Sequence, residues 1–234
     1  MKDLYLRIME GKGDIVDIQE IEKSDPQFQS IVKLEKTVEN KELFLSLIIA
    51  NSIICYQIYM TGEQYRETFC NYFDKASFQT GEIITKVEKF ANIYNKRILE
   101  GKIKRLKKLT SFFQDFNGRS AFYHENMVAL RDDLARYLGV GKGKIQRNDG
   151  MKTINFAIKM FSYGARNIYG FRRFPVEIGI PIDSRLEKIF EKYRGDYNDI
   201  NLFYTDLAGK LCLSPLHLDA VLWINTDKLM RGNS

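Results

Sequence analysis

Apolar residues recur along most of this chain at steps of three and four, the spacing that places them on one face of an α-helix. A clear example is the series Leu43, Leu47, Ala50, Ile54, Ile58. The alternation of apolar and polar residues that marks a half-buried strand is nearly absent. The pattern therefore predicts an all-α protein, with helices over about residues 43–58, 62–73, 80–99, 101–115, 122–138, 152–168, 184–194, 198–210 and 214–225.

Prolines and glycines indicate where the chain passes from one part of the molecule to another. The four prolines are at positions 26, 175, 181 and 215, so the stretch from Gln27 to Phe174 contains none. Because proline is the strongest helix breaker, this stretch is free to form long helices. Residues 166–181 contain both glycines and prolines, and they are the expected crossing between two helical lobes.

Composition narrows the class of protein. With 44% hydrophobic and 28% charged residues among 234, the chain has the balance of a soluble globular protein with a substantial core. Its longest apolar stretch, Leu43 to Met60, is interrupted by polar residues, so no membrane partner is expected. Thirty-six basic residues against thirty acidic ones leave a net charge of +6, which suits a polyanion such as nucleic acid.

The cysteines and histidines indicate neither disulfides nor a metal site. Cys55, Cys70 and Cys212 are widely spaced and odd in number. His124 and His217 lack metal-ligand spacing with cysteines or carboxylates, and each is expected to be a surface or core residue. We therefore expect no site metal. Because the N-terminus also lacks a secretory signal, we expect an intracellular protein.

A glycine-rich turn, Gly139-Val-Gly-Lys-Gly-Lys144, separates two expected helices. It is not a Walker loop, because no Ser or Thr follows a Gly-Lys at the required spacing, and its glycines do not match the dinucleotide fingerprint. Such a turn can present backbone N–H groups and lysines to a phosphate, although a glycine C-cap with a surface loop gives the same pattern. The residues expected to contact a DNA backbone are Gly139, Gly141, Lys142, Gly143 and Lys144.

Lys152 and Asp183 are the candidates for chemistry. Lys152 begins the helix after the turn, where the helix dipole and partial burial would disfavour the ammonium form and free the amine for attack. Asp183 precedes the capping-box sequence Ser184-Arg-Leu-Glu187, which would hold this carboxylate rigidly. Each residue also has an ordinary explanation, as a solvated lysine and as an acidic residue that stabilises a helix N-terminus.

Helix geometry groups further residues into a candidate base pocket. Lys152, Phe156 and Lys159 share one face of their helix. Asp219 and Trp223 likewise share a face of the last helix. Two aromatic rings and a carboxylate could sandwich a flipped purine and accept hydrogen bonds from its Watson–Crick edge. Core packing would also explain the aromatic residues, but a carboxylate in an apolar run is expensive to bury without a partner.

Three spaced motifs carry a family resemblance: Lys152-Thr-Ile-x-Phe156-x-x-Lys159-Met, Pro181-x-Asp183 and Asp219-x-x-x-Trp223. With these motifs the chain resembles the helix-hairpin-helix DNA glycosylases, and most closely the archaeal GO glycosylases that remove 8-oxoguanine. Residues 144–151 lengthen the hairpin relative to the compact form of other branches. No four-cysteine iron–sulfur motif follows, which disfavours the endonuclease III-like branch.

The resemblance implies a role for each residue of the site. Lys152 would be the nucleophile, and Asp183 would stabilise positive charge on the deoxyribose as the base leaves. Phe156 and Trp223 would stack on the damaged base. The remaining contacts with the base would come from Gln27, Lys159, Asp219 and Tyr65, the last at a position where the family more often has tryptophan.

The resemblance also implies two helical lobes with the base pocket between them. The expected first lobe is residues 1–75 plus 175–234, and the second is residues 76–174 with the helix-hairpin-helix at about 122–165. We expect a monomeric, DNA-associated cytoplasmic protein of a prokaryote.

The sequence thus predicts a bifunctional glycosylase and apurinic-site lyase that acts on 8-oxoguanine in double-stranded DNA. Lys152 would attack C1′, and the resulting imine would permit strand cleavage by β-elimination without an external cofactor. Two other classes stay open at this point. One is a non-catalytic helix-hairpin-helix DNA-binding module, and the other is a helical protein-interaction domain whose hairpin binds no phosphate.

Overall fold

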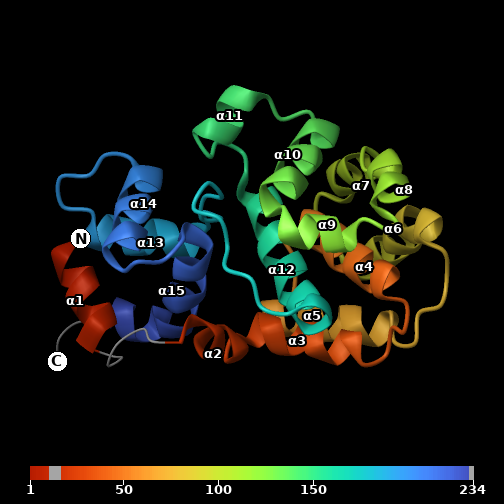
Figure 1. The fold of residues 1–234 in the computed structure, drawn as a ribbon, viewed down its shortest axis with the longest axis horizontal. Helices are drawn as coiled ribbons and strands as arrows, with labels where there is room; N and C mark the ends of the chain where they lie inside the picture. The colour runs from red at the N-terminus through yellow and green to blue at the C-terminus, as the bar shows by residue number, and fades with distance from the viewer. Residues whose placement is uncertain (11–16, 232–234) are drawn as a thin grey trace.

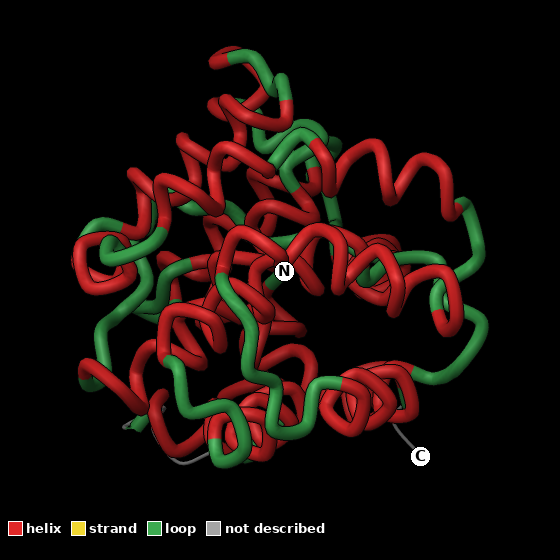
Figure 2. Tube along the Cα trace, turned by 90° about the vertical axis from the view of Figure 1, so that its right-hand side faces the viewer, coloured by secondary structure: helices red, strands yellow, loops and turns green. Residues whose placement is uncertain are grey.

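The expected all-α fold is confirmed. The computed structural model describes residues 1–10 and 17–231, and every regular element among them is a helix. Figures 1 and 2 show these helices joined by loops, without a strand in the described part of the chain. No single helix of that part is long and apolar enough to span a membrane, although the pair Ile200–Lys210 and Pro215–Met230, bent by 91°, passes the same test on length and composition.

Short polar side chains begin many of the helices, because they accept hydrogen bonds from backbone N–H groups that have no partner within the helix. Such caps are Asp17, Asp25, Asn40, Thr61, Asp183, Asp199 and Ser214. The helices are α1 (Lys2–Glu10), α2 (Ile18–Lys23), α3 (Pro26–Glu35), α4 (Lys41–Ile54), α5 (Gly62–Tyr72), the 3₁₀ turn η1 (Thr80–Glu82), α6 (Ile83–Tyr94), α7 (Leu99–Lys107), α8 (Thr110–Phe116), α9 (Ser120–Glu125), α10 (Met127–Leu138), α11 (Lys142–Gln146), α12 (Lys152–Tyr169), α13 (Ser184–Tyr193), α14 (Ile200–Lys210) and α15 (Pro215–Met230).

A large hydrophobic core is built from the helices between α3 and α12. Its centre is the packing of α12 against α4, the most extensive contact between two helices. Gly164 permits this close approach, since a Cβ atom there would lie 2.6 Å from Cδ1 of Ile48. The buried face of α12 therefore has one fixed orientation, and this fixes the direction of every other residue on the helix.

A second, smaller core joins both ends of the chain: α1 and α2 contribute Leu4, Ile8 and Ile18, and most of the rest comes from α13, α14 and α15. In Figure 1 this group, at the left, lies beside the larger helical body. The extended segment between α12 and α13 passes from one core to the other, with Ile178 in the large core and Ile180 in the small one. The crossing expected over residues 166–181 therefore contains this passage.

The cores divide the chain differently from the expected lobes. Residues 26–75, which the expected first lobe combines with the C-terminal segment, pack in the large core with α6 to α12. From the N-terminal segment the small core takes only residues 1–10 and 17–23. It also takes most of the buried apolar residues from Ile180 onward, whereas Leu216 belongs to the large core. Residues 11–16 and 232–234, which also belonged to the expected first lobe, lie outside the described residues.

Several expected helices are shorter or interrupted. The helix expected over 43–58 ends at Ile54, since Gln57 has a φ of 45° that no helix accommodates. The helix expected over 80–99 ends at Tyr94, where buried Asn95 turns its amide to the carbonyl oxygen of Ile54. The expected helices over 101–115 and 122–138 are each divided in two. Helices α1, α2, α3 and α11 lie in segments for which no helix was expected.

Candidate active site

A cleft of about 570 Å³ opens between the two cores. Its walls come from seven parts of the chain: the start of α3, the loop after α4, the first turns of α5, α7, the start of α12 with the residues before it, the N-terminus of α13 with the residues before it, and α15. The cleft brings together most of the residues that the sequence selected for catalysis and base binding. These are Gln27, Lys152, Phe156, Asp183, Asp219 and Trp223.

Lys152 is the first residue of α12, and its side chain is exposed in the cleft. The sequence suggested partial burial, so that part of the argument for a reactive amine is wrong. What holds Lys152 in place is the helix behind it, since the next turn buries Ile154 and Asn155. An amine on a rigid helix end can approach a substrate without first being freed from a core.

Asp183 forms the N-cap of α13. Its Oδ1 accepts hydrogen bonds from the backbone N–H groups of Arg185 and Leu186, at 3.1 and 2.9 Å, and its Oδ2 lies 3.4 Å from the Arg185 guanidinium. The sequence suggested a capping box that began at Ser184, but the cap is one residue earlier. One carboxylate oxygen therefore caps the helix while the other contacts Arg185, and Asp183 as a whole lines the cleft.

Asn148 links the segments that carry Lys152 and Asp183. Its side-chain amide donates to the carbonyl oxygen of Ile180 at 3.0 Å and to Oδ1 of Asn201 at 2.8 Å. Its Oδ1 accepts a hydrogen bond from Asn155 on α12. Because Gly179 has no Cβ, the chain before Asp183 can pass directly over the Asn148 side chain. Asn148 was not selected from the sequence, since Ile180 and Asn201 are distant along the chain.

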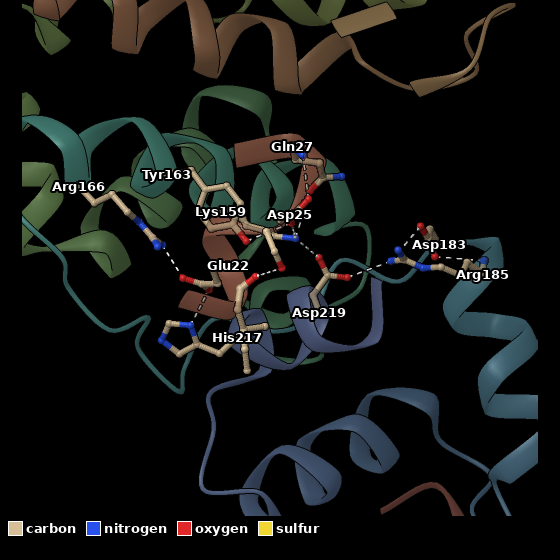
Figure 3. Close-up of polar contacts among 12 residues, drawn as sticks. Glu22, Asp25, Gln27, Lys159, Tyr163, Arg166, Asp183, Arg185, His217 and Asp219 are labelled. Carbon is tan, nitrogen blue, oxygen red and sulfur yellow. Dashed lines mark hydrogen bonds and ion pairs between the residues drawn. The ribbon is translucent and has the colours of Figure 1, made fainter. Parts of the chain in front are cut away.

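Beneath the cleft lies a buried ion cluster centred on Lys159 (Figure 3). Its Nζ is 2.7 Å from Oδ2 of Asp219 and 3.2 Å from Oδ2 of Asp25. It also donates to Oε1 of Gln27 at 3.2 Å. Burial opposes the charged form of Lys159, but attraction from the two carboxylates outweighs it and raises the pKa of Lys159 above its ordinary value. Lys159 is therefore a permanent cation that holds Asp219 and Gln27 at the cleft wall.

This position differs from the role expected for Lys159. Its side chain is fully buried and does not line the cleft, so the structure does not bring it to the place of a bound base. Asp25, the second carboxylate of the cluster, was not selected from the sequence. It was hidden by an ordinary signal, because an aspartate before Pro26 is a typical helix start, and Asp25 does cap α3 as well.

Arg185 is a third residue that was not selected from the sequence. Figure 3 shows its guanidinium between Asp183 and Asp219, with Nη2 at 3.4 and 3.1 Å from their oxygens. The same guanidinium stacks on the ring of Trp223, 4.1 Å from its centroid. Nothing in the sequence separates Arg185 from any other charged residue in the first turn of a helix.

A second buried cluster ties the two cores together. Glu22 of α2 accepts hydrogen bonds from Arg166 of α12 at 2.6 Å and contacts Nδ1 of His217 on α15 at 2.7 Å. The other ring nitrogen of His217 accepts the backbone N–H of Phe174. His217 is thus a core residue, one of the two positions expected for it, and this cluster fixes α15 against α12.

Tyr65 does not reach the cleft. It is fully buried, its hydroxyl donates to Oδ1 of Asn51 at 2.8 Å, and it accepts a hydrogen bond from Asn95. Burial raises its pKa well above the ordinary value for tyrosine. The expected contact between Tyr65 and a base is therefore not supported by this arrangement, in which Tyr65 instead supports the helix that precedes the cleft loop.

The glycine-rich turn has the form of a C-cap followed by a short helix. Gly139 ends α10 in the left-handed region, with a φ of 77°, and α11 begins at Lys142. Five of the six residues from Gly139 to Lys144 are exposed. Their backbone and lysines are accessible to a large partner. Among the described residues, no group of three or more histidine, cysteine or acidic side chains is placed to hold a metal ion.

Sequence comparison gives a consistent result along almost the whole chain. A family model described as AGOG, N-glycosylase/DNA lyase, matches residues 11–234. An N-glycosylase/DNA lyase of Thermococcus kodakarensis is 35% identical over 207 residues, which cover 86% of this chain and 75% of the relative. One from Methanococcus maripaludis is 34% identical over 209 residues, which cover 86% and 78%.

The fold is also similar to a solved structure. It is that of the 8-oxoguanine DNA glycosylase Pa-AGOG from Pyrobaculum aerophilum, in complex with 8-oxoguanosine. The two structures superpose with a TM-score of 0.77 over 100% of this chain and 92% of the other, at 21% sequence identity. At that identity the likeness shows the shared fold.

Proposed function

This chain belongs to the AGOG family of N-glycosylase/DNA lyases, and from that premise we propose that its cleft removes 8-oxoguanine from DNA and then cleaves the abasic strand. The observation that carries the proposal is the composition of the cleft. An accessible amine, Lys152, shares it with the carboxylate of Asp183 and with a second wall formed by Phe156, Trp223 and Asp219. Chemistry and base recognition therefore have separate groups in one cavity.

Recognition would begin with extrusion of the damaged nucleotide into the cleft, which costs a few kcal/mol and is offset by stacking and backbone contacts. Phe156 and Trp223 supply aromatic faces for the base. The Watson–Crick edge of 8-oxoguanine carries N1–H and N2–H₂ donors, and Asp219 is a carboxylate that accepts such donors well. The Gln27 amide, held by Lys159 through its Oε1, lies at the same wall.

Catalysis would use Lys152 as the nucleophile. Its neutral amine attacks C1′ of the deoxyribose, the bond from C1′ to the base breaks, and the base leaves with the bonding electron pair. Asp183 stabilises positive charge on the sugar during this step. The amine nitrogen then loses a proton and the C1′–O4′ bond breaks, with O4′ taking up a proton, so the sugar ring opens and leaves an imine at C1′. Loss of a C2′ proton from this imine expels the 3′ phosphate by β-elimination. Every group in this sequence comes from one chain, which suits a protein that acts as a monomer.

The duplex would be held beside the cleft by the turn before α12. Gly141 and Gly143 would offer backbone N–H groups, while Lys142 and Lys144 would add positive charge, and all four are exposed. The N–H of Gly139 instead donates to the carbonyl oxygen of Arg136 in the cap of α10. Only a few residues separate this turn from Lys152, so contact with a phosphate would bring the neighbouring sugar toward the amine. Of the two cores, the large one would carry the DNA-binding turn and the nucleophile, and the small one Asp183 and Trp223.

Borohydride trapping on an 8-oxoguanine duplex tests the proposal directly, because reduction makes the imine permanent. We expect a covalent complex with the wild-type protein and none with Lys152→Gln, which should still bind DNA. Lys41→Gln is the matched control, since Lys41 is also an exposed first residue of a helix but does not line the cleft. A trapped complex in Lys152→Gln would place the nucleophile elsewhere.

Trapping together with a DNA-binding titration on the same protein distinguishes the proposed enzyme from the other two classes of protein. A non-catalytic DNA-binding module would bind the duplex, with an affinity that falls steeply as salt rises, but would form no trapped complex. A protein-interaction domain would show neither property. The buried cluster of Lys159, Asp25 and Asp219 favours an enzyme, because neither alternative requires a carboxylate to be held at a cleft wall.

A further inference from the structure

Arg185 occupies part of the cleft in the free protein. Its guanidinium lies over the ring of Trp223, 4.1 Å from the ring centroid, and its side chain is 15% exposed. Both residues line the cavity. The aromatic face that the proposed function gives to the base therefore already has a planar, cationic occupant.

The same arginine also uses the acceptor proposed for the base. Its Nη2 lies 3.1 Å from Oδ1 of Asp219, the oxygen that points away from Lys159. The contact is loosely made, because Nε and Nη1 of Arg185 find no hydrogen-bond partner among the described residues. Lys159, in contrast, is engaged with three acceptors, Asp219, Asp25 and Gln27. Lys159 is therefore held by three acceptors at once, whereas Arg185 reaches Asp219 through a single nitrogen.

The guanidinium of Arg185 and a guanine-type base present similar chemical groups. The edge of guanine-type bases presents N1–H and N2–H₂ on one carbon, in a plane, and so does the guanidinium. Each can stack on an aromatic ring and donate to a carboxylate. We propose that Arg185 is a placeholder for the base: it covers Trp223 and satisfies Asp219 until a flipped guanine-type base displaces it from both. This inference rests on the proposed function of the cleft.

Displacement has a consequence for the proposed catalytic carboxylate. Of its two carboxylate contacts, Arg185 keeps only Asp183 once Asp219 is bound to a base. Entry of the base thus changes the charge around Asp183 at the moment when the sugar reaches Lys152. Arg185 is a positioning residue in this scheme, and it links recognition to the site of chemistry.

The chain has a single tryptophan, so its fluorescence reports on Trp223 alone. We would titrate guanosine and 8-oxoguanosine into the wild-type protein and into Arg185→Ala, and follow this emission. Because the placeholder competes for stacking and for one charged hydrogen bond, its removal should tighten binding of both nucleosides by a similar factor, about three- to tenfold. Acrylamide should also quench Trp223 more strongly in Arg185→Ala without ligand.

Arg185→Lys keeps the charge but loses the planar fork, so its affinity should lie between those of the wild type and Arg185→Ala. Arg194→Ala, at the other end of α13, is the control and should bind as the wild type does. Unchanged or weaker binding in folded Arg185→Ala would overturn the placeholder, as would an effect confined to 8-oxoguanosine. If no protein bound either nucleoside, the proposed pocket itself would fail together with the placeholder.

Discussion

The ammonium of Lys159 lies 2.7 Å from Oδ2 of Asp219, and both side chains are buried. A buried ion pair rarely stabilises a protein more than apolar residues of the same size would, because both charges lose their hydration. The effect of this pair is instead to fix the position of Asp219 in the cleft wall. Asp25 completes the cluster and balances the lysine from the side of α3.

Lys159→Met should destabilise the protein by about 3–5 kcal/mol, because it leaves Asp25 and Asp219 buried without their cation. Denaturant unfolding measures the change. Lys41→Met, at an exposed lysine, should lie within about 0.5 kcal/mol of the wild type. A similarly small effect of Lys159→Met would mean that Lys159 is not part of the fixed cluster, and would return it to the role of a base contact.

Asp183→Asn should separate capping from catalysis. Asparagine is as good an N-cap as aspartate, so stability should change by less than about 1 kcal/mol, while loss of the charge should lower base excision by about 100-fold or more. Asp199 is the matched control, because its Oδ1 accepts from two backbone N–H groups of α14 in the same way. Single-turnover excision should be unaffected by Asp199→Asn. Equal rates in all three proteins would leave Asp183 only its role as a helix cap.

Asn148→Ala should loosen the link between the two parts of the active site. It removes the contacts of Asn148 with Ile180, Asn201 and Asn155, which hold the chain before Lys152 against the chain before Asp183. Since small misplacement of reacting groups is costly, we expect kcat for base excision to fall by about 10- to 100-fold with little change in DNA affinity. A loss of DNA affinity with normal kcat would instead assign Asn148 to the binding surface.

The sequence was sufficient to predict the placement of residues whose position depends on local helix periodicity. Phe156 is placed one turn after Lys152 by helix periodicity alone, and Trp223 follows Asp219 in the same way. Both pairs reach the cleft as expected. The sequence also anticipated that Asp219 could not be buried alone, and the structure supplies its partners.

What the sequence could not supply depends on contacts between distant parts of the chain. Lys159 shares the periodicity of Lys152 but lies deeper along α12, where α3 and α15 cover it, and periodicity does not show which turn is covered. Arg185 looked like a solvated charge, because its aromatic partner, Trp223, is on another helix. The helix expected to continue to residue 58 ends early for a similar reason: buried Asn95 takes the carbonyl oxygen of Ile54.

Buried Lys102 should make stability depend on pH. Among the described residues its ammonium donates only to neutral acceptors, Oδ1 of Asn95 and the carbonyl oxygen of Gln57, and it lies over the ring of Tyr56. Burial lowers its pKa from 10.5 to about 8, although the nearby Cys55 opposes the shift. Between these two values the unfolded chain binds more protons than the folded protein, so the contribution of Lys102 to stability rises with pH across this window. Below about pH 8, Lys102 is protonated in both the folded and the unfolded state, so the folded protein bears the full free-energy cost of burying the ammonium.

The measurement is the free energy of unfolding as a function of pH. Relative to Lys102→Met, the wild-type protein should gain stability from about pH 8 to pH 10.5 and show a constant difference at lower pH. Lys104→Met, which changes an exposed lysine on the same helix, should run parallel to the wild type. A flat difference for Lys102→Met would show that this amine is protonated throughout the range.

Residues that contact the base should affect the reaction rate only when the substrate still carries a base. Asp219→Asn keeps the shape of the side chain and an acceptor for Lys159, but it weakens the acceptor offered to N1–H and N2–H₂. Excision of 8-oxoguanine should fall by about 10- to 100-fold, as expected for the loss of one charged hydrogen bond. Trp223→Ala should cost about 1–3 kcal/mol of transition-state stabilisation through lost stacking.

At a preformed abasic site neither residue has a base to contact, so strand cleavage there should proceed at nearly the wild-type rate in both variants. The comparison uses one protein on two substrates, and a general defect in folding or DNA binding would lower both rates together. Lys152→Gln is the opposite control, because it removes the amine that both reactions need. Equal losses on the two substrates for Asp219→Asn would mean that Asp219 acts by maintaining the buried cluster, and that the base edge is read by another group in the cleft.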